Sequence, residues 1–215
     1  MSRPSVLVVA KAPVPGLAKT RIARTVGDAR AAELAAAALL DTLDAATASG
    51  MRVVVAMTGD LARASRRDDL TETLAGVAVV AQRGRGLGAR LANAHADADE
   101  GHGVVQIGMD SPQVTAADLS VAAAMLGTHR SVLGPATDGG WWLLGVRSAD
   151  QATVLAGVPM STDATGALTR EALGGTVGAV RTLNDMDEWS DAESIAAAHP
   201  HLRVSGVVHA MVARS

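Results

Sequence analysis

The fold is indicated most clearly by one stretch near the start of the chain, Val6-Leu-Val-Val-Ala-Lys-Ala-Pro-Val-Pro-Gly-Leu-Ala-Lys-Thr-Arg21. Residues 6–10 form a continuous apolar run rich in β-branched side chains, which is typical of a strand buried on both faces. The loop that follows contains two prolines, which fix its path, and Gly16, which permits a turn or a close backbone approach. A strand of this kind belongs to a sheet that is covered on both of its faces.

The same alternation of apolar runs and helix-forming stretches continues along the chain. Further strands are predicted at residues 53–57, 77–81, 104–107, 132–133, 142–146 and 177–183, the first three of them buried. Helices are predicted at residues 31–48, 61–67, 87–98, 116–126, 165–173 and 188–198, with Asp28 as the cap of the first. Since no repeat or composition break interrupts the alternation, we expect one α/β domain over residues 1–215, with a mostly parallel central sheet flanked by helices.

Composition agrees with a packed domain and narrows the classes of function. Of the 215 residues, 48% are hydrophobic and 19% are charged, which is enough apolar material for a buried core. The formal net charge of −3 gives no basic surplus for a phosphate backbone, so nucleic acid is not expected as a partner. The chain has no cysteine, which excludes disulfides, thiolate catalysis and cysteine-based zinc sites.

The start of the chain bears on location. Its apolar run ends at Lys11 and is too short for a signal peptide or a membrane span, so we expect a cytoplasmic protein without membrane contact. A homodimer is compatible with the sequence.

The loop after the first strand holds three cations, Lys11, Lys19 and Arg21. In parallel sheets, ligands bind beyond the carboxyl ends of strands, so these side chains are expected to converge on a di- or triphosphate. Arginine offers a bidentate fork and lysine a point charge for phosphate oxygens. The spacing is not that of a P-loop, and the alternative is a solvated basic loop.

A lone acid, Asp110, follows the predicted strand at residues 104–107, in the motif Gly108-Met-Asp-Ser-Pro112. A carboxylate at this edge can hold Mg²⁺ or Mn²⁺ and so bridge phosphate oxygens. The alternative is a cap for the next helix, but Thr115 is better placed for that task.

Two further segments carry candidate substrate contacts. In Gly134-Pro-Ala-Thr-Asp-Gly-Gly-Trp-Trp142, the glycines Gly139 and Gly140 beside Asp138 permit close approach of a ligand, and Trp141 or Trp142 could form an apolar wall. The alternative is a plain hairpin turn with one buried tryptophan.

Other acids begin predicted helices. Asp163, in Ser161-Thr-Asp163, is either a helix cap or a substrate contact. In Asn184-Asp-Met-Asp187, one acid is expected to cap the next helix and the other to complete the metal site, for which we choose Asp187.

The segment Gly84-Arg-Gly-Leu-Gly-Ala89 fits a relaxed dinucleotide-binding pattern between a strand and a helix. It follows the third strand rather than the first, and short glycine patterns arise by chance in a chain with 22 Gly. We therefore interpret it as a loop near the nucleotide, with Arg85 and Arg90 as phosphate or base contacts, and keep an NAD-dependent dehydrogenase as a distant alternative.

Taken in order, these motifs resemble a bacterial family of small GT-A-like transferases. Four segments carry the resemblance, which extends over nearly the whole chain. They are the motif of residues 11–22, Gly108-Met-Asp-Ser-Pro-Gln113, the turn at residues 134–145 and Ser161-Thr-Asp163. Members are often labelled as candidate glycosyltransferases, some assigned to arsenosugar biosynthesis, and the first loop also resembles the phospholactate guanylyltransferases. The resemblance implies a GT-A-like nucleotide-diphospho-sugar transferase fold and a metal-binding role for Asp110. The usual Asp-x-Asp is absent, so a second metal ligand must lie elsewhere.

Three functions follow as hypotheses. The first is a metal-dependent glycosyltransferase that passes a sugar from an NDP-sugar to a small molecule, with Asp110 and Asp138 as its catalytic residues. The second is a nucleotidyltransferase that joins an NTP to a small phosphorylated acceptor and releases pyrophosphate. The third is a nucleotide-binding protein without turnover.

Overall fold

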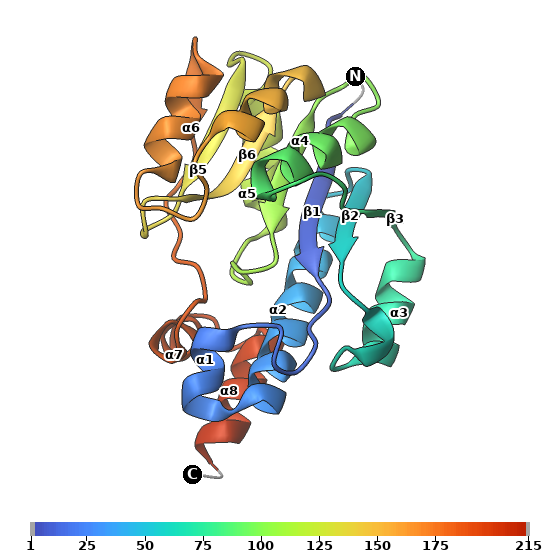
Figure 1. The fold of residues 1–215 in the computed structure, drawn as a ribbon, viewed down its shortest axis with the longest axis vertical. Coiled ribbons are helices and arrows are strands. Elements are labelled where there is room, and N and C mark those ends of the chain that lie inside the picture. The colour runs from blue at the N-terminus through green and yellow to red at the C-terminus, as the bar shows by residue number, and fades with distance from the viewer. Residues whose placement is uncertain (1–2, 214–215) are drawn as a thin grey trace.

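The computed structural model describes residues 3–213, which form a seven-stranded sheet with helices on both faces (Figure 1). The strand order is β3-β2-β1-β4-β6-β5-β7. All neighbouring pairs are parallel except β4–β6 and β5–β6, because β6 runs against the others. The predicted α/β fold with a mostly parallel central sheet is therefore confirmed. The strands are β1 (Ser5–Lys11), β2 (Val53–Thr58), β3 (Ala78–Ala81), β4 (Val104–Gly108), β5 (Ser131–Pro135), β6 (Trp141–Val146) and β7 (Val177–Ala179).

Strand β1 lies between β2 and β4, and its alternate side chains enter different cores. Val6 and Val8 pack with α2 (Asp28–Ala48), α3 (Arg67–Ala75) and α5 (Ala116–Met125) on one face. Leu7 packs with α4 (Leu87–Ala98), α6 (Thr165–Leu173) and η2 (Ala149–Gly157) on the other. Because a strand presents successive side chains to opposite faces, a strand buried on both sides must be apolar at every position. The register, in which Val8 lies opposite Val55 and Ile107, brings the ends of β1 and β4 to the same edge.

Strand β3 departs from the prediction. It was expected to be buried, but it lies at the edge of the sheet, and Val79 is 46% exposed. An apolar run cannot by itself distinguish an edge strand from a central one. Strand β7 ends at Ala179, four residues before the predicted end, and the chain then crosses toward the site.

The predicted helices at residues 31–48, 87–98, 116–126, 165–173 and 188–198 are found, with small shifts at their ends. The helix predicted at residues 61–67 is wrong, because only residues 61–63 form a 3-10 turn and the helix begins at Arg67. Thr115 caps α5 in a capping box with Asp118, as expected. Asp28 is not a cap, because Gly27 holds that position with a φ of 86° and Asp28 begins the helix. Helices α1 and α8 and the 3-10 helix η2 were not predicted. The helices are α1 (Thr20–Val26), α2 (Asp28–Ala48), α3 (Arg67–Ala75), α4 (Leu87–Ala98), α5 (Ala116–Met125), α6 (Thr165–Leu173), α7 (Trp189–Ala198) and α8 (Arg203–Val212), with 3-10 helices η1 (Leu61–Arg63) and η2 (Ala149–Gly157).

Helices α1 and α8 pack on α2, α7 packs on α8 and α1, and the four helices form a third core (Figure 1). Ile22 of α1, Leu34 of α2 and Ile195 of α7 belong to it. This bundle lies beyond the carboxyl end of β1, so it anchors the loop that leaves that strand. Among residues 3–213, no helix has both the length and the apolar character that a membrane crossing requires.

Candidate active site

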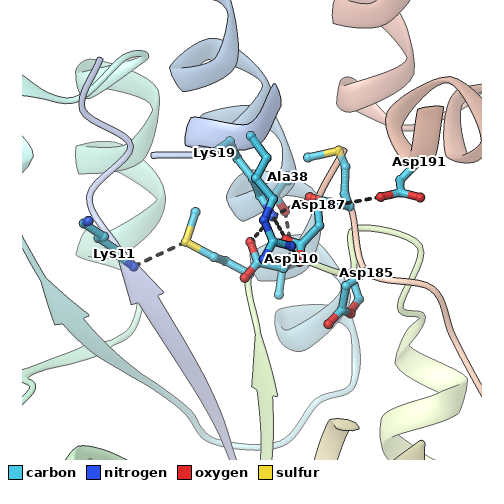
Figure 2. Close-up of polar contacts among 12 residues, drawn as sticks. Lys11, Lys19, Ala38, Asp110, Asp185, Asp187 and Asp191 are labelled. Atoms are coloured by element: carbon cyan, nitrogen blue, oxygen red, sulfur yellow. Dashed lines mark hydrogen bonds and ion pairs between the residues drawn. The ribbon is translucent and has the colours of Figure 1, made fainter. Parts of the chain in front are cut away.

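Lys19 occupies the centre of the site, between two carboxylates that the first loop does not contain. Its ammonium lies 2.5 Å from Asp110 Oδ1 and 3.4 Å from Asp187 Oδ1, and it donates to the carbonyl of Met186 at 2.5 Å. Figure 2 shows the side chains of Lys19, Asp110 and Asp187 turned toward one another. Only 7% of the Lys19 side chain is exposed, whereas both carboxylates are nearly half exposed.

The electrostatics of Lys19 follow from this arrangement. Burial alone would lower the pKa of Lys19, but the charges of Asp110 and Asp187 outweigh it, and the pKa is held above its ordinary value. The backbone of Lys19 has a φ of 47° and a ψ of 48°, in the left-handed region. That conformation is uncommon for lysine and costs on the order of 1 kcal/mol or more. The ion pairs hold Lys19 in it.

Two elements far apart in the sequence bring the carboxylates to this point. Asp110 follows β4, directly beside the end of β1. Asp187 belongs to the segment between β7 and α7, which is fixed because the Met186 N–H donates to the Asp110 carbonyl at 2.8 Å. The amide of Gln113 also donates to the Asn184 carbonyl at 2.6 Å. These contacts hold Asp187 against the end of β4.

The other two cations of the loop flank Lys19. Arg21 contacts Asp187 at 3.3 Å, and its side chain is 62% exposed. The exposed Lys11 donates from its ammonium to the Leu17 carbonyl at 2.8 Å, and its backbone N–H contacts the Met109 sulfur at 3.3 Å. A cavity of about 260 Å³, which we call the cationic pocket, opens between them. Its lining residues are Lys11, Leu17, Ala18, Lys19, Thr20, Arg21, Ala35, Met109, Asp110 and Asp187.

The donor atoms around Lys19 fit a hard divalent cation. Two carboxylates and the Met186 carbonyl approach one ammonium, so three oxygens already point at one positive charge. Oxygen ligands of this kind are those that Mg²⁺ and Mn²⁺ prefer. Within residues 3–213, no group of three or more His, Cys, Asp or Glu could hold a metal by itself. A cation here would thus take two protein carboxylates and draw its remaining ligands from substrate or water.

A second cavity, of about 280 Å³, lies on the other side of Asp110, and we call it the acidic pocket. Asp110 lines both cavities. Apolar walls come from β1, α4, β6 and the segment before α6. Its lining residues are Val9, Leu87, Leu91, Gln106, Gly108, Asp110, Ser111, Asp138, Gly140, Trp141, Trp142, Met160, Ser161, Thr162, Thr165 and Asp185.

The turn between β5 and β6 places Asp138 at the acidic pocket. The Asp138 carboxylate accepts the Gly140 N–H at 2.8 Å, which orients the acid. Gly139 has a φ of 87°, and a Cβ there would lie 1.9 Å from the Asp163 carbonyl oxygen. Only glycine fits at this position. The absence of a side chain lets the backbone of the turn pack directly against the backbone just before α6.

The two tryptophans after this turn face different surroundings. Trp141 is partly buried and donates from its indole to Thr169 at 3.1 Å. Trp142 is 2% exposed and donates to the Arg181 carbonyl at 2.9 Å. Both line the acidic pocket, with Trp141 offering the more accessible surface.

Asp185 is a site residue that the sequence did not single out. It lines the acidic pocket and accepts a short hydrogen bond from Ser111. Burial raises the pKa of Asp185 to about 6, against the lowering effect of the Ser111 hydrogen bond. The signal was present in the motif of residues 184–187, where one acid was expected to cap a helix. That expectation was wrong for both acids, because Glu188 caps α7 in a capping box with Asp191.

The remaining candidates lie away from the two pockets. Arg85 and Arg90 line neither of them, and Arg90 bonds weakly to its own helix start at 3.4 Å. Gly16 sits in the first loop with a φ of 77°. Asp163 lines a separate hollow beside Gly139 and Gly140, and it is not a helix cap, because α6 has Ala164 at that position without a side-chain bond.

The chain belongs to the bacterial family described as "Uncharacterized protein conserved in bacteria (DUF2064)", which matches residues 40–162. No curated protein matches the chain. The predicted relationship to small GT-A-like transferases is confirmed by similar solved structures. A crystal structure described as a "putative nucleotide-diphospho-sugar transferase" from Desulfovibrio desulfuricans G20 is 25% identical, with a TM-score of 0.84 over 100% of this chain and 98% of that one.

Two more distant structures share the fold. Rv0371c from Mycobacterium tuberculosis H37Rv, solved as a complex with manganese, is 18% identical, with a TM-score of 0.55 over 90% of this chain and 98% of that one. A CMP:2-keto-3-deoxy-manno-octonic acid synthetase complexed with CTP is 13% identical, with a TM-score of 0.55 over 93% of this chain and 99% of that one. At these identities the likeness concerns the fold.

Proposed function

We propose that this protein is a metal-dependent transferase with a nucleotide-activated donor, and that it passes a sugar from an NDP-sugar to a small molecule. The observation that carries the proposal is the convergence of Lys19, Asp110 and Asp187 at the carboxyl edge of the sheet. Ligands of open α/β sheets bind at this edge. The full-length likeness to the Desulfovibrio protein supports the same class.

The cationic pocket suits the diphosphate of such a donor. Lys11, Lys19 and Arg21 approach from one loop, and Arg21 is exposed enough to turn its fork toward phosphate oxygens. Negative charge grows on the diphosphate as its bond to the sugar breaks, so fixed cations there stabilise the transition state more than the ground state.

Asp110 and Asp187 are the residues that would hold Mg²⁺ or Mn²⁺. Such an ion, when bound, neutralises charge on the leaving diphosphate. The Lys19 ammonium now pairs with both carboxylates, and it becomes available to a phosphate oxygen when they bind a cation instead. The manganese complex of the M. tuberculosis protein of the same fold supports this choice of metal.

The acidic pocket suits the sugar and its acceptor. Asp138 is fixed by its own turn and can accept the proton of an attacking hydroxyl, because a base must lie within hydrogen-bonding reach of that proton. Trp141 offers an aromatic face to the apolar side of a sugar ring. Gly139, Gly140 and Asp163 keep the turn closed on α6 beside it.

A nucleotidyltransferase is the second candidate. The three cations of one loop could equally hold a triphosphate, and the synthetase of the same fold is complexed with CTP. Attack at the α-phosphate would then release pyrophosphate, whereas glycosyl transfer releases the nucleoside diphosphate.

The experiment that tests the proposal follows the leaving group. The protein is incubated with panels of NDP-sugars and NTPs, each with small hydroxyl and phosphorylated acceptors and with or without Mn²⁺. Released nucleoside diphosphate and released pyrophosphate are measured separately. Metal-dependent NDP release that Asp110→Asn abolishes supports glycosyl transfer. Asp150→Asn removes an exposed acid on η2 and serves as the matched control. Pyrophosphate release supports the second candidate, and nucleotide binding without any release supports a non-catalytic binding protein.

A further inference from the structure

The two pockets that meet at Asp110 differ sharply in charge. The cationic pocket is lined by three cations and two acids. The acidic pocket is lined by three acids, Asp110, Asp138 and Asp185, and its described lining residues include no Lys, Arg or His. The difference is local, because the whole chain carries a formal net charge of only −3.

Two cations contact residues that line the acidic pocket, and both are already paired with carboxylates. Lys19 points into the other pocket and already pairs with Asp110 and Asp187. Arg181, whose carbonyl accepts from Trp142, directs its guanidinium to Asp118 at 2.6 Å. Without a bound metal, an anion in the acidic pocket would therefore meet several carboxylates and no cation among the lining residues, and such like-charge contacts weaken binding. When Asp110 holds a metal, Asp138 and Asp185 still line the pocket.

The other lining residues favour a ligand that has hydroxyl groups on a carbon skeleton. Carboxylates accept hydrogen bonds from hydroxyls, and Ser111 and Thr162 add polar groups. Trp141, Met160 and Leu87 provide apolar walls against carbon–hydrogen faces.

We infer that the acceptor is a hydroxyl compound that carries neither phosphate nor carboxylate, and that the charge of the acidic pocket excludes its phosphate esters. This inference rests on the proposed function and narrows its substrate class. In the transfer, the bond between the sugar's anomeric carbon and the diphosphate oxygen breaks, and its electron pair leaves with the NDP. The acceptor oxygen bonds to that carbon, and its proton passes to the Asp138 carboxylate.

The inference can be tested by binding alone, without turnover. The probes are glycerol, glucose and myo-inositol, each beside its monophosphate, and the readout is the ¹⁵N–¹H signal of the Trp141 indole. A Trp141→Phe variant assigns that signal among the three tryptophans. Titrations are run at pH 8, with and without saturating NDP and Mn²⁺.

The expected result is that at least one neutral probe shifts the Trp141 signal and that its phosphate ester binds at least tenfold more weakly. In Asp138→Asn the ratio should fall to within about threefold, because a repelling charge is gone. Asp150→Asn should leave the ratio unchanged. An ester that binds as tightly as its parent, or a Trp141 signal that none of the probes moves, overturns the inference.

The same samples separate this outcome from failure of the proposed function. Mn²⁺-dependent NDP binding, measured by calorimetry, reports the cationic pocket only. If NDP binds and the esters bind as well as their parents, the inference fails and the transferase proposal stands. If NDP does not bind, the proposed function fails. The indole titration still shows whether the acidic pocket binds neutral compounds more tightly than their phosphate esters.

Discussion

The loop after β1 and the loop after β3 look alike in sequence and differ in the structure. Both contain glycine, both have two or more basic residues in the loop or directly beside it, and both precede a helix. The first brings Lys19 and Arg21 to two carboxylates. The second leaves Arg85 exposed, and none of residues 82–86 lines the cationic or the acidic pocket. The difference arises from sheet position: β1 is central and adjoins β4, while β3 is an edge strand. Position in the sheet, more than loop composition, decides which cations can act together.

The largest expected effect comes from Asp110, the acid that the first loop meets. Asp110→Asn keeps the size of the side chain but removes a charged metal ligand, so the Mn²⁺-dependent part of nucleotide affinity should be lost entirely. Calorimetric titration of NDP with and without Mn²⁺ measures it, and thermal unfolding checks that the fold is kept. Unchanged Mn²⁺ dependence would remove the metal assignment.

The second prediction concerns Arg21 and its contribution to the binding of nucleotide phosphates. Arg21→Ala should weaken NDP binding by about 2–4 kcal/mol, or about 30- to 1,000-fold in Kd, if the bound contact is desolvated. Arg21→Lys keeps the charge and loses the fork, so it should fall between wild type and alanine. Nucleosides without phosphate should bind all three proteins equally. A penalty that appears with NTP but not with NDP would favour nucleotidyl transfer.

The next prediction concerns His95 on α4, the helix that follows the second loop, and its contribution to the stability of the fold. It lies fully buried on α4, with Nε2 2.8 Å from Gln106 Oε1, and burial lowers the pKa of His95 from 6.5 to about 4. Because the folded protein resists protonation there, its stability should be complete above pH 6.5 and fall as the pH drops toward 4. The loss attributable to His95 is about 3 kcal/mol at most. Urea unfolding of wild type and His95→Gln between pH 7.5 and 4 measures it, and parallel curves for the two proteins would contradict the assignment.

The smallest effect is expected for Arg85 of the second loop and for Arg90 on the helix α4 that follows it. Arg85→Ala and Arg90→Ala should change NDP affinity by less than about threefold and stability by about 0.5 kcal/mol or less, because these side chains line neither pocket. NADH should not bind, since the glycine-containing loop follows an edge strand. A large loss in Arg85→Ala, or enhanced and blue-shifted NADH fluorescence, would break the comparison between the loops.

The sheet could be predicted from the sequence because its strands are short runs made mostly of apolar residues. Residues 6–10 and 104–107 need no distant information to be recognised as buried. Helix α1 was missed because it begins directly after a loop rich in proline and glycine, and its packing partners on α7 lie far along the chain. The exposure of β3 depends on strand order, which no local pattern encodes.

The site was predictable where it lies next to β1 and β4, and less so elsewhere. Lys11, Lys19, Arg21 and Asp110 could be chosen because they follow strands of a parallel sheet. The burial of Lys19 could not, since its partner Asp187 lies 168 residues away. Local sequence also could not tell Asp185 from Asp187, because the two acids differ only in which pocket they face.

The packing of the β5–β6 turn on α6 limits how this site can diversify. A Cβ at Gly139 would collide with the Asp163 carbonyl, and one at Gly166 would lie 2.7 Å from the Gly140 carbonyl. The Gly166 N–H also donates to the Gly139 carbonyl at 2.8 Å. The backbone of the turn and the backbone of α6 cannot shift independently. Asp138 is therefore held in a rigid turn. We therefore expect substrate preference among related proteins to change through side chains such as Trp141 and Met160, while the path of the turn stays the same.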